Sequence, residues 1–504
     1  MSHRSRFRRS ALVCLLGAAL TSSAFATSFN FRMVSPGLRT AAPSMPAAPA
    51  TPLSMSLAAA SLPNATRSAP YSFDFSTLLT MSGDGQPSAS QVSWSTSGAV
   101  PAGLSLGADG VLSGTPTALG SGSFTVTAAY TDKSGQQVYT LLVNGVPLDV
   151  VQISAGNGFT CAVTTAGAAK CWGGGGYGRL GDGNSVNSAV PVTVLGLSSG
   201  VSAIATGHMH ACAVTSGGAL KCWGRNTWGQ LGDGTTVDKP SPVTVTGLAS
   251  GVASVAASLY STCAVTTAGA ALCWGGNDYA GLGDGTTVAK STPVAVSGKS
   301  SGVAKVAVGP LHTCAVSTTG GLSCWGANYY GQIGDGTTSV SRTTPVAVSG
   351  LASGVTSVSI GNDHSCAVAS GAVKCWGFNG DYQLGDGTTT NRLAPVTATG
   401  LGSGMVRVGV GFSYACATTT AGAVKCWGKN DNGQLGDGTI TTRPTAVSVV
   451  GLAATASPDI TLGYQHACAL PSSGPAQCWG ANGASQLGDG TSTTPRLAPV
   501  NVLQ

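Results

Sequence analysis

One sequence unit occurs seven times in succession between Val150 and the C-terminus, and this repetition limits the available folds more than any other feature. The first cysteine of each unit lies at position 161, 212, 263, 314, 366, 416 or 468, so successive units are 50 to 52 residues apart. A period near 50 residues with four short apolar runs is typical of a β-propeller blade. Closing the blades into a ring protects sheet edges that an open solenoid leaves exposed. We therefore predict an all-β chain with a seven-bladed β-propeller over residues 149–504.

The composition of the chain also favours a β-rich fold. None of the 18 acidic residues is Glu, Gly accounts for 74 of 504 residues, and charged residues make up only 8%. Glu is a good helix former and Gly a poor one, so a largely helical fold is excluded. Low hydrophobicity and high net charge, which mark a disordered chain, are both absent.

Each repeat carries two cysteines whose spacing predicts a disulfide. Six pairs are ten residues apart. If the two cysteines of such a pair face each other on a hairpin, the loop between the strands has three residues and ends in Gly. Three-residue hairpin loops favour Gly at this last position. The remaining pair is nine apart and leaves the two-residue loop Ser370-Gly371, which keeps the cysteines opposed. This spacing fits neither a zinc site nor a CxxC redox pair. The predicted disulfides are Cys161–Cys171, Cys212–Cys222, Cys263–Cys273, Cys314–Cys324, Cys366–Cys375, Cys416–Cys426 and Cys468–Cys478.

The N-terminus predicts export. Four arginines precede the apolar run Ala11–Leu20, and Ala24-Phe25-Ala26 then offers a small-x-small cleavage site, so residues 1–26 are assigned to a signal peptide. Removing these four arginines leaves 20 basic against 18 acidic residues, too small an excess for nucleic-acid binding. No later segment is apolar enough to span a membrane. We expect a monomeric protein that is secreted, periplasmic or on the cell surface, where disulfides form.

Two further regions precede the propeller. Residues 27–66 are rich in Ala, Pro and Ser and are assigned to a linker. Residues 67–148 contain alternating runs such as Phe124–Ala128 and Val138–Val143, which predict a small β-sandwich without cysteines. The segments Pro101–Leu106 and Gly110–Thr117 resemble the immunoglobulin-like modules of bacterial surface and secreted proteins. This resemblance implies a spacer or adhesive element.

The repeats resemble the RCC1 (regulator of chromosome condensation) family. The motifs that carry the resemblance are Gly-x-x-His-x-Cys-Ala-Val, Trp-Gly-x-Asn-x-x-Gly-Gln-Leu-Gly and a trailing Pro-Val-x-Val, over about 355 residues. The resemblance implies a seven-bladed propeller. The best-known intracellular member is a guanine-nucleotide exchanger that uses a protruding element, and no repeat here has room for such an insertion. Exported bacterial relatives include propellers that bind and inhibit another protein, which suits this chain better.

Two recurrent polar positions are interpreted as structural. His210, His312, His364 and His466 lie two residues before the first cysteine of their repeats, but other repeats have Phe159, Ser261 or Tyr414 there, which leaves a metal ring incomplete. The Asp of the repeated Gly-Asp-Gly favours a turn through bonds to nearby backbone N–H groups. The seven repeated tryptophans are assigned to packing between blades. We therefore predict no metal site and no cofactor.

A variable position after each Trp-Gly offers a candidate binding surface. It carries large aromatic residues in the first four repeats but Asp381, Asn432 and Ala484 in the last three. Aromatic residues and Arg dominate protein-binding hot spots, although packing alone also explains an aromatic residue at this position. The candidate partner-binding residues are Tyr177, Arg225, Trp228, Tyr279, Tyr329 and Tyr330.

These features predict a binding platform for a protein or glycan partner. No phosphate-binding loop, HExxH motif or paired Glu is present, and no Gly-x-Ser-x-Gly opens a helix as a nucleophile elbow does, so we expect no enzyme activity and no catalytic residues. Two alternatives stay open. One is a structural surface protein without a specific ligand, and the other, by family resemblance only, is a regulator that acts like a nucleotide exchanger.

Overall fold

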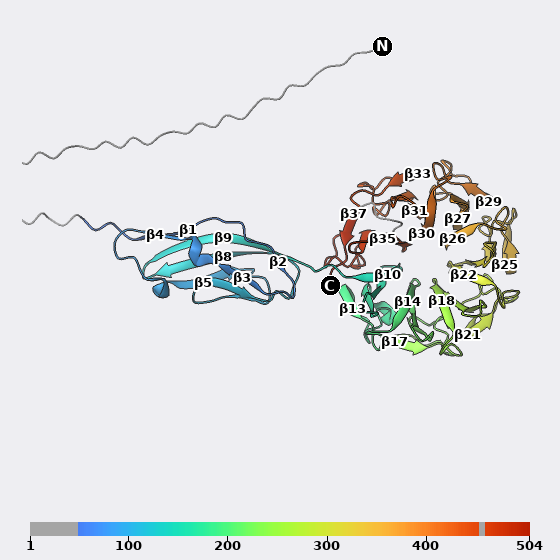
Figure 1. The fold of residues 1–504 in the computed structure, drawn as a ribbon, viewed down its shortest axis with the longest axis horizontal. Coiled ribbons are helices and arrows are strands. Elements are labelled where there is room, and N and C mark those ends of the chain that lie inside the picture. Colours follow the sequence, from blue (N-terminus) through green and yellow to red (C-terminus); the bar gives the residue numbers. More distant parts are fainter. Residues whose placement is uncertain (1–48, 453–458) are drawn as a thin grey trace, which may run out of the picture. The chain divides into compact units, whose positions relative to one another are not determined.

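The computed structural model describes residues 49–452 and 459–504, and the described residues from 53 onward belong to one compact unit. The predicted signal peptide, most of the predicted linker and residues 453–458 lie outside the described residues. The described chain is all-β, as predicted, and forms a sandwich followed by a ring of small sheets (Figure 1).

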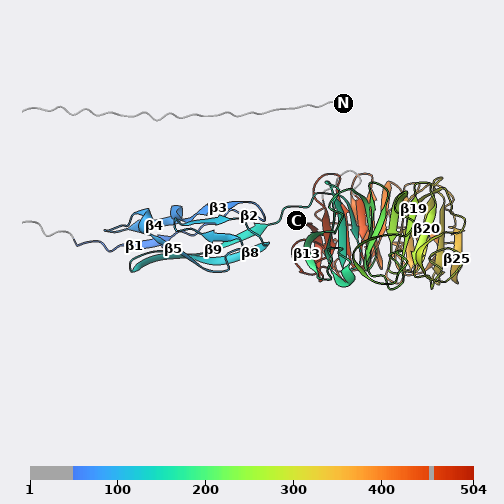
Figure 2. The same cartoon turned by 90° about the horizontal axis from the view of Figure 1, so that it is seen from below.

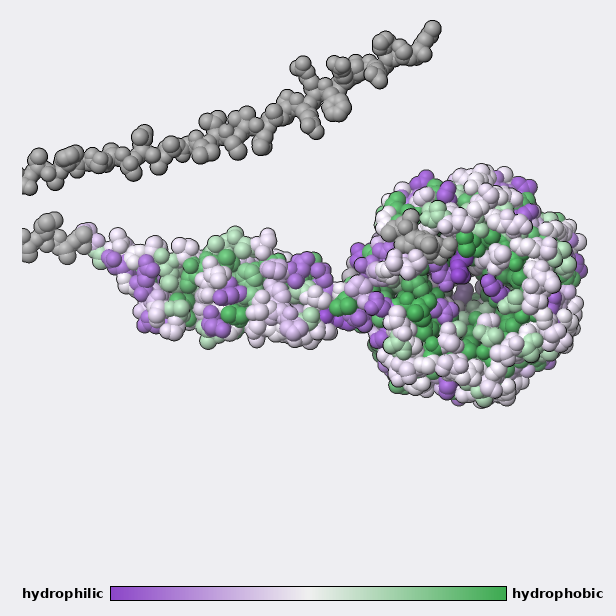
Figure 3. Space-filling view, in the orientation of Figure 1, coloured by the Kyte–Doolittle hydropathy of each residue, from purple (hydrophilic) through white to green (hydrophobic). Residues whose placement is uncertain are grey.

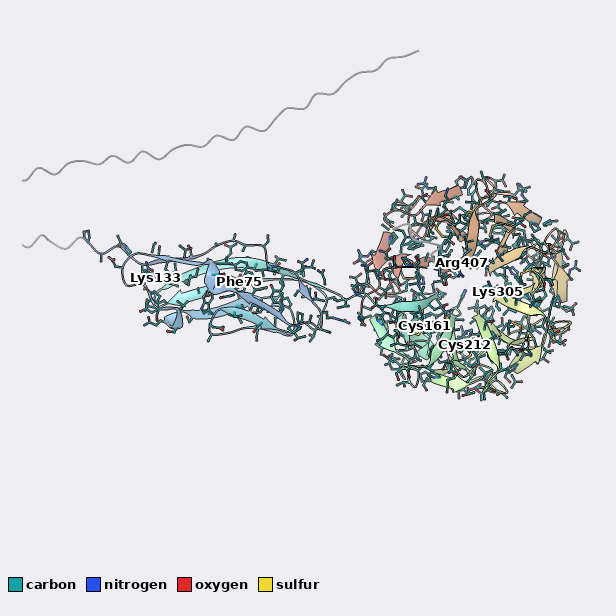
Figure 4. All side chains as sticks on the ribbon, viewed as in Figure 1. Phe75, Lys133, Cys161, Cys212, Lys305 and Arg407 are labelled. Carbon is teal, nitrogen blue, oxygen red and sulfur yellow. A yellow bond between two sulfur atoms is a disulfide. The ribbon has the colours of Figure 1, made fainter. Side chains whose placement is uncertain are left out.

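The sandwich consists of three small sheets around an apolar centre, and Figure 2 shows β3 in a different layer from β5, β8 and β9. Strand order is β2-β9-β8-β5 in the largest sheet, β3-β7-β6 in the second and β1-β4 in the third. Alternate residues of the long strands, such as Phe124, Val126 and Leu141, are fully buried around Phe75 (Figure 4). The elements are β1 (Ser54–Leu57), β2 (Ala65–Thr66), β3 (Tyr71–Asp74), the 3-10 helix η1 (Phe75–Leu78), β4 (Leu79–Ser82), η2 (Ala89–Gln91), β5 (Ser93–Gly98), β6 (Leu104–Leu106), β7 (Val111–Gly114), β8 (Gly120–Tyr130) and β9 (Lys133–Asn144).

The sandwich begins before residue 67, where the sequence analysis placed its start. Strand β1 pairs with β4 and buries Met55 and Leu57, while β2 pairs with the end of β9. The predicted linker 27–66 is therefore too long at its C-terminal end. The alternation in Ser54-Met55-Ser56-Leu57 is only four residues long and follows an Ala/Pro-rich stretch, which hid the strand.

The ring contains seven four-stranded antiparallel sheets, each built from one repeat (Figure 1). The innermost strands surround the central opening and are β10 (Val150–Ala155), β14 (Val201–Thr206), β18 (Val252–Ala257), β22 (Val303–Val308), β26 (Val355–Ile360), β30 (Met405–Val410) and β34 (Asp459–Leu462). The second strands are β11 (Phe159–Thr164), β15 (His210–Thr215), β19 (Ser261–Thr266), β23 (His312–Ser317), β27 (His364–Ala369), β31 (Tyr414–Thr419) and β35 (His466–Leu470).

The two outer positions of each blade complete the sheets. The third strands are β12 (Ala169–Gly173), β16 (Leu220–Gly224), β20 (Ala271–Gly275), β24 (Leu322–Asn328), β28 (Ala372–Gly377), β32 (Val424–Gly428) and β36 (Gln477–Gly480). The outermost strands are β13 (Ser188–Thr193), β17 (Lys239–Thr244), β21 (Lys290–Ala295), β25 (Ser339–Ala347), β29 (Arg392–Thr397), β33 (Arg443–Ser448) and β37 (Arg496–Asn501). The 3-10 helix η3 (Gly176–Gly178) lies between β12 and β13.

A disulfide joins the second and third strands of every blade, as predicted. The register places the paired cysteines directly opposite each other, with Cα–Cα distances of 4.0 or 4.1 Å in all seven cases. In six hairpins the three-residue loop ends in a Gly with positive φ, such as Gly167 at 77°. The shorter hairpin uses Ser370 and Gly371, both with positive φ, as a two-residue loop requires. Every paired cysteine is fully buried.

The blades are joined by the repeated tryptophans. Each indole N–H donates to a backbone carbonyl of the preceding blade at 2.9 to 3.0 Å, and all seven rings are fully buried. Trp172 of the first blade donates to the carbonyl of Gln486 in the last blade, so the ring closes with the same contact that joins neighbours elsewhere. The predicted packing role of these residues is confirmed.

The Asp of each Gly-Asp-Gly lies in a turn that a buried hydrogen-bond cluster fixes in blades two to seven. In the sixth blade Asp437 accepts bonds from Asn430 and Thr439 and pairs with Arg443 at 2.7 Å. Burial alone would raise the pKa of Asp437, but the bonds from Thr439 and Arg443 together hold it below its ordinary value. The first blade lacks this cluster because Gly175 replaces the Asn, and Asp182 contacts only the neighbouring Asn184 in the bonds described.

This difference gives a matched pair of substitutions. We expect Asp437→Ala to lower the free energy of unfolding by about 2 kcal/mol, because the buried amide of Asn430 loses an acceptor and Arg443 loses its partner. Asp182→Ala should cost roughly 0.5 kcal/mol or less, since its carboxylate lies in a partly exposed turn. Urea unfolding of both variants measures the difference, and equal costs would contradict the structural role of the cluster.

Candidate functional site

Two sets of loops share one face of the propeller. In an antiparallel four-stranded blade the loop between strands one and two and the loop between strands three and four lie at the same end, and Figure 2 shows the strands running across the thickness of the ring. The disulfide hairpins, which connect strands two and three, lie at the opposite end. The variable aromatic position after each Trp-Gly therefore lies on the same face as the residues that follow each innermost strand.

The residues after the innermost strands surround an axial cavity of about 90 Å³, to which all seven blades contribute. The ring of Tyr464 lies 4.1 Å from that of Phe412 and 5.7 Å, edge to face, from that of His208. Burial lowers the pKa of His208 to about 4, so this imidazole is neutral at pH 7. The hydroxyl of Ser258 in the same cavity bonds to Ser261 and not to His208. This arrangement offers aromatic contact surface and no paired nucleophile and base.

Polar side chains occupy the central opening as well (Figure 3). Lys305 and Arg407 are both seen there in Figure 4. Lys305 donates to the carbonyl of Thr356 at 3.1 Å, and Arg407 pairs with Asp459 of the last blade at 3.3 Å. These contacts connect neighbouring innermost strands, whose inner edges have no further strand to pair with.

The six predicted partner-binding residues lie in the loops between the third and fourth strands of blades one to four. The five aromatic side chains among them are 37% to 46% exposed, and we call these five residues the aromatic arc: Tyr177, Trp228, Tyr279, Tyr329 and Tyr330. The guanidinium of Arg225 lies 5.2 Å from the centre of the Tyr177 ring, a cation–π contact between blades one and two. Tyr177 has φ of 64°, the left-handed region that a non-Gly residue occupies at a cost.

Trp228 and Tyr279 line one cavity of about 120 Å³, which we call the aromatic groove. Its other walls are Tyr260, which follows the innermost strand of the third blade, and Pro310 and Leu311, which follow that of the fourth. The rings of Trp228 and Tyr260 meet nearly at right angles, with centroids 5.8 Å apart. The exposed carboxylate of Asp278 supplies a negative charge.

The remaining members of the arc contact other aromatic rings. Tyr329 packs edge to face on Tyr279 at 6.3 Å, and Tyr330 lies 5.0 Å from Phe378 of the fifth blade. Sequence reasoning missed Tyr260 and Phe378. Tyr260 could have been found by comparing the repeats at the position just before the histidine, where the third repeat alone has an aromatic residue.

The histidines of the repeats are buried between blades. His210 bonds to Thr262 and His312 to Ser365 of the following blade, at 2.8 and 2.7 Å, and His466 bonds to Thr160 across the ring closure. The sixth repeat has Ala415 at the position that Thr262 and Ser365 hold in theirs, so no hydroxyl is offered to His364, and neither of its ring nitrogens has a hydrogen-bond partner. Burial lowers the pKa of all four imidazoles to about 3.

Residues 49–452 and 459–504 bring no three His, Cys, Asp or Glu side chains together in a geometry that could hold a metal ion. They also contain no helix with the length and hydropathy needed to cross a bilayer.

Comparison with family models matches both parts of the chain. Residues 113–417 match the model described as "RCC1-like domain", and residues 405–434 and 421–470 match RCC1 repeat models. Residues 51–144 match the model described as "Putative Ig domain", in agreement with the sandwich and with its start before residue 67.

Similar proteins share the repeats over part of their length. The human E3 ubiquitin-protein ligase HERC2 is 36% identical over 222 residues, which are 43% of this chain but 5% of HERC2. The ultraviolet-B receptor UVR8 of Arabidopsis thaliana is 32% identical over 298 residues, which are 57% of this chain and 67% of UVR8. These relatives are eukaryotic, so the exported bacterial origin stays a prediction.

Solved structures agree on the fold. Human WBSCR16 superposes with a TM-score of 0.58 at 22% identity, over 67% of this chain and 90% of that one. Yeast RCC1 (Prp20), in its complex with Kap60, gives 0.59 at 20% identity, over 71% and 85%. More than half of the present chain matches the first family model. The chain belongs to the RCC1-like domain family.

Proposed function

We propose that this protein is a binding protein whose propeller captures a protein partner through the aromatic arc. The observation that carries the proposal is the concentration of exposed aromatic side chains on one face of blades one to four, where blades five to seven have Asp381, Asn432 and Ala484. Interblade packing requires the buried tryptophans in all seven blades, but it does not require exposed rings in only four. Exposed Trp and Tyr beside an Arg are the residues that contribute most to protein–protein affinity.

A protein partner has further support from a structural neighbour. The similar yeast propeller RCC1 (Prp20) is bound to the protein Kap60 in its crystal structure.

We also propose that binding takes place outside the reducing cytosol, because seven buried disulfides require oxidising conditions to form. Exchange activity is not part of the proposal, since every repeat keeps a length of 50 to 52 residues.

Capture experiments with matched variants test this function. The mature chain, Tyr177→Gly/Trp228→Ala/Tyr279→Ala and the control Asp381→Ala/Asn432→Ala are immobilised and exposed to the surroundings of the producing cell. We expect one protein to bind at one-to-one stoichiometry, and the triple variant to lose at least about tenfold in affinity while the control retains it. The Tyr177→Gly change also relieves the left-handed backbone, so it should not reduce stability. Equal capture by all three proteins would favour a structural role without a specific ligand.

A further inference from the structure

An arginine of this chain lies on an aromatic ring of the arc at the boundary between blades one and two. The guanidinium of Arg225 is 5.2 Å from the centre of the Tyr177 ring, within the range of a cation–π interaction. Its Nε donates to the hydroxyl of Thr227 at 3.1 Å, and its Nη1 lies 3.6 Å from the sulfur of Met209. This guanidinium is therefore held by a ring of the preceding blade and by two residues of its own blade.

The aromatic groove repeats this arrangement one blade later, without the arginine. Each of the three groups around the guanidinium has a counterpart at the same distance from the cysteines of the next repeat. These counterparts are Trp228 for Tyr177, Asp278 for Thr227 and Tyr260 for Met209. All three counterparts line the groove. The position of Arg225 is taken by Gly276, which also lines the groove and has no side chain to place there.

Gly276 occupies a position from which a side chain reaches the preceding blade. In blade five the same position carries Phe378, whose ring lies 5.0 Å from that of Tyr330 in blade four. A Cβ atom on Gly276 would lie 3.6 Å from the Cβ of Trp228 and 3.0 Å from that of Tyr260. The φ of Gly276 lies outside the left-handed region, so its backbone does not require glycine. The small residue therefore leaves Trp228 accessible to a side chain from another molecule.

The groove carries a negative charge that the described chain does not neutralise. Asp278 is exposed, and it is the one charged residue among the described residues that line the cavity. Its carboxylate forms no ion pair within residues 49–452 and 459–504. In blade six the same repeat position carries Asp431, which pairs at 3.4 Å with Lys429, the residue at the position of Arg225. The groove thus has the carboxylate of this pair without its cation.

A guanidinium suits these groups better than other cations. It is planar, stacks on aromatic rings and donates two parallel hydrogen bonds to a carboxylate, whereas an ammonium is a compact and strongly hydrated point charge. Trp is the best ring for a cation–π interaction. The hydroxyls of Tyr260 and Tyr279 form no hydrogen bond within the part of the chain that the structure describes, so their oxygens can accept further N–H groups. A quaternary ammonium has no N–H to donate to them.

We infer that the aromatic groove binds an arginine side chain of the protein partner, with the guanidinium on the indole of Trp228 and its N–H groups directed to the carboxylate of Asp278. This inference rests on the proposed function, because the groove includes two members of the aromatic arc. The chain's own Arg225 already fills the equivalent place between blades one and two. The partner therefore supplies between blades two and three the cation that the chain supplies one blade earlier.

Two small probes test the inference on the mature chain. N-acetyl-L-arginine amide carries the guanidinium, and N-acetyl-L-citrulline amide has nearly the same shape with a neutral urea group in its place. Saturation-transfer NMR measures the dissociation constant of each probe. We expect saturable binding of the arginine probe, at least about fivefold tighter than that of the citrulline probe, because the neutral group loses both the cation–π and the ion-pair contribution.

Four variants locate the bound probe. Trp228→Ala and Asp278→Asn should each weaken binding of the arginine probe at least about fivefold, and Asp278→Asn should also reduce its dependence on salt. Gly276→Arg should weaken it at least about tenfold, because the new guanidinium takes the place of the probe as Arg225 does in blade two. The control Asp431→Asn, at the position of Asp278 in blade six, should change binding by less than about twofold.

Several outcomes would overturn the inference. These are equal binding of the two probes, unchanged binding of the arginine probe to either Gly276→Arg or Asp278→Asn, and groove-dependent binding of tetramethylammonium or chitohexaose without binding of the arginine probe. In the capture experiment, Gly276→Arg should also weaken partner binding at least about tenfold. If the arginine probe fails while capture still depends on the arc, only this inference falls. If capture ignores the arc, the proposed function falls, and with it the assignment of the arginine to a partner.

Discussion

Lowering the pH from 7 to about 4.5 should unfold the propeller while the sandwich stays folded. All five histidines of the described residues lie in the propeller, four of them fully buried between blades, and burial lowers their pKa to about 3, or about 4 for His208. In the unfolded chain the same imidazoles take up protons near pH 6.5. A group whose pKa is lower in the folded state contributes stability above the unfolded pKa and loses it as the pH falls.

The size of this loss is large compared with ordinary protein stability. Each histidine lowers the free energy of unfolding by about 1.4 kcal/mol per pH unit between pH 6.5 and its folded pKa, so five together approach roughly 7 kcal/mol per pH unit. A typical domain has only about 5–15 kcal/mol in total. The aspartates with lowered pKa, such as Asp437, add a further loss only below their ordinary value near 3.8. We therefore expect the midpoint of acid unfolding between about pH 4.5 and 6.

His364 provides a test of the mechanism. Its ring nitrogens have no partner, and Phe159 occupies the corresponding fully buried position in the first blade. His364→Phe should therefore leave stability at pH 7.5 unchanged or raise it by up to about 1 kcal/mol, and should reduce the pH slope by about 1.4 kcal/mol per unit. His312→Phe should reduce the slope equally but cost about 1 kcal/mol at pH 7.5, because it breaks the bond to Ser365.

Urea unfolding at a series of pH values measures both effects. The sandwich serves as an internal control, since residues 27–148 contain no histidine, and Trp94 reports on it. Stability that does not change between pH 7 and 4.5, or an unchanged slope in both variants, would show that the histidines are protonated in the folded protein.

The propeller could be predicted from the sequence because its determinants are local and repeated seven times. The cysteine spacing fixes the hairpin register within about ten residues, and the shorter loop at Ser370-Gly371 shows which residues oppose each other. The start of the sandwich could not be placed, because β1 is held by its pairing with β4, some 25 residues later, and not by a strong pattern of its own.

The aromatic groove could be predicted only in part. Trp228 and Tyr279 stand out in their own repeats, but the walls formed by Tyr260 and Leu311 come from different loops of the third and fourth blades. Which loops meet depends on the closeness of neighbouring blades, a property of the closed ring that no single repeat encodes. The same holds for His364, whose missing partner is explained by Ala415 in the next blade.

Loss of the disulfides should be the most damaging covalent change to the propeller. In the chain-entropy account a crosslink that closes a loop of about ten residues contributes roughly 2–3 kcal/mol, so Cys416→Ala/Cys426→Ala should lower the free energy of unfolding by about that amount. Seven such crosslinks exceed the usual stability of a domain, and we expect the fully reduced propeller to be unfolded at 25 °C. The sandwich, whose residues 27–148 contain no cysteine, should unfold at the same urea concentration with or without reductant.

The disulfides should be reduced only after the propeller has opened, which adds a kinetic test to this prediction. Because every paired cysteine is fully buried, a thiol reductant reaches the sulfur atoms only after a blade opens, so reduction in buffer alone should be slow and should become fast in urea. Unfolding curves after reduction in urea, followed by transfer to buffer, measure the loss, and peptide mapping without reduction identifies the pairs. Crosslinks between different blades, or a reduced propeller that refolds with its original midpoint, would contradict the prediction. Without the disulfides, the interblade tryptophan contacts alone would have to hold the ring together. A chain that folds in a reducing compartment never forms the disulfides, so it would depend on those contacts throughout folding.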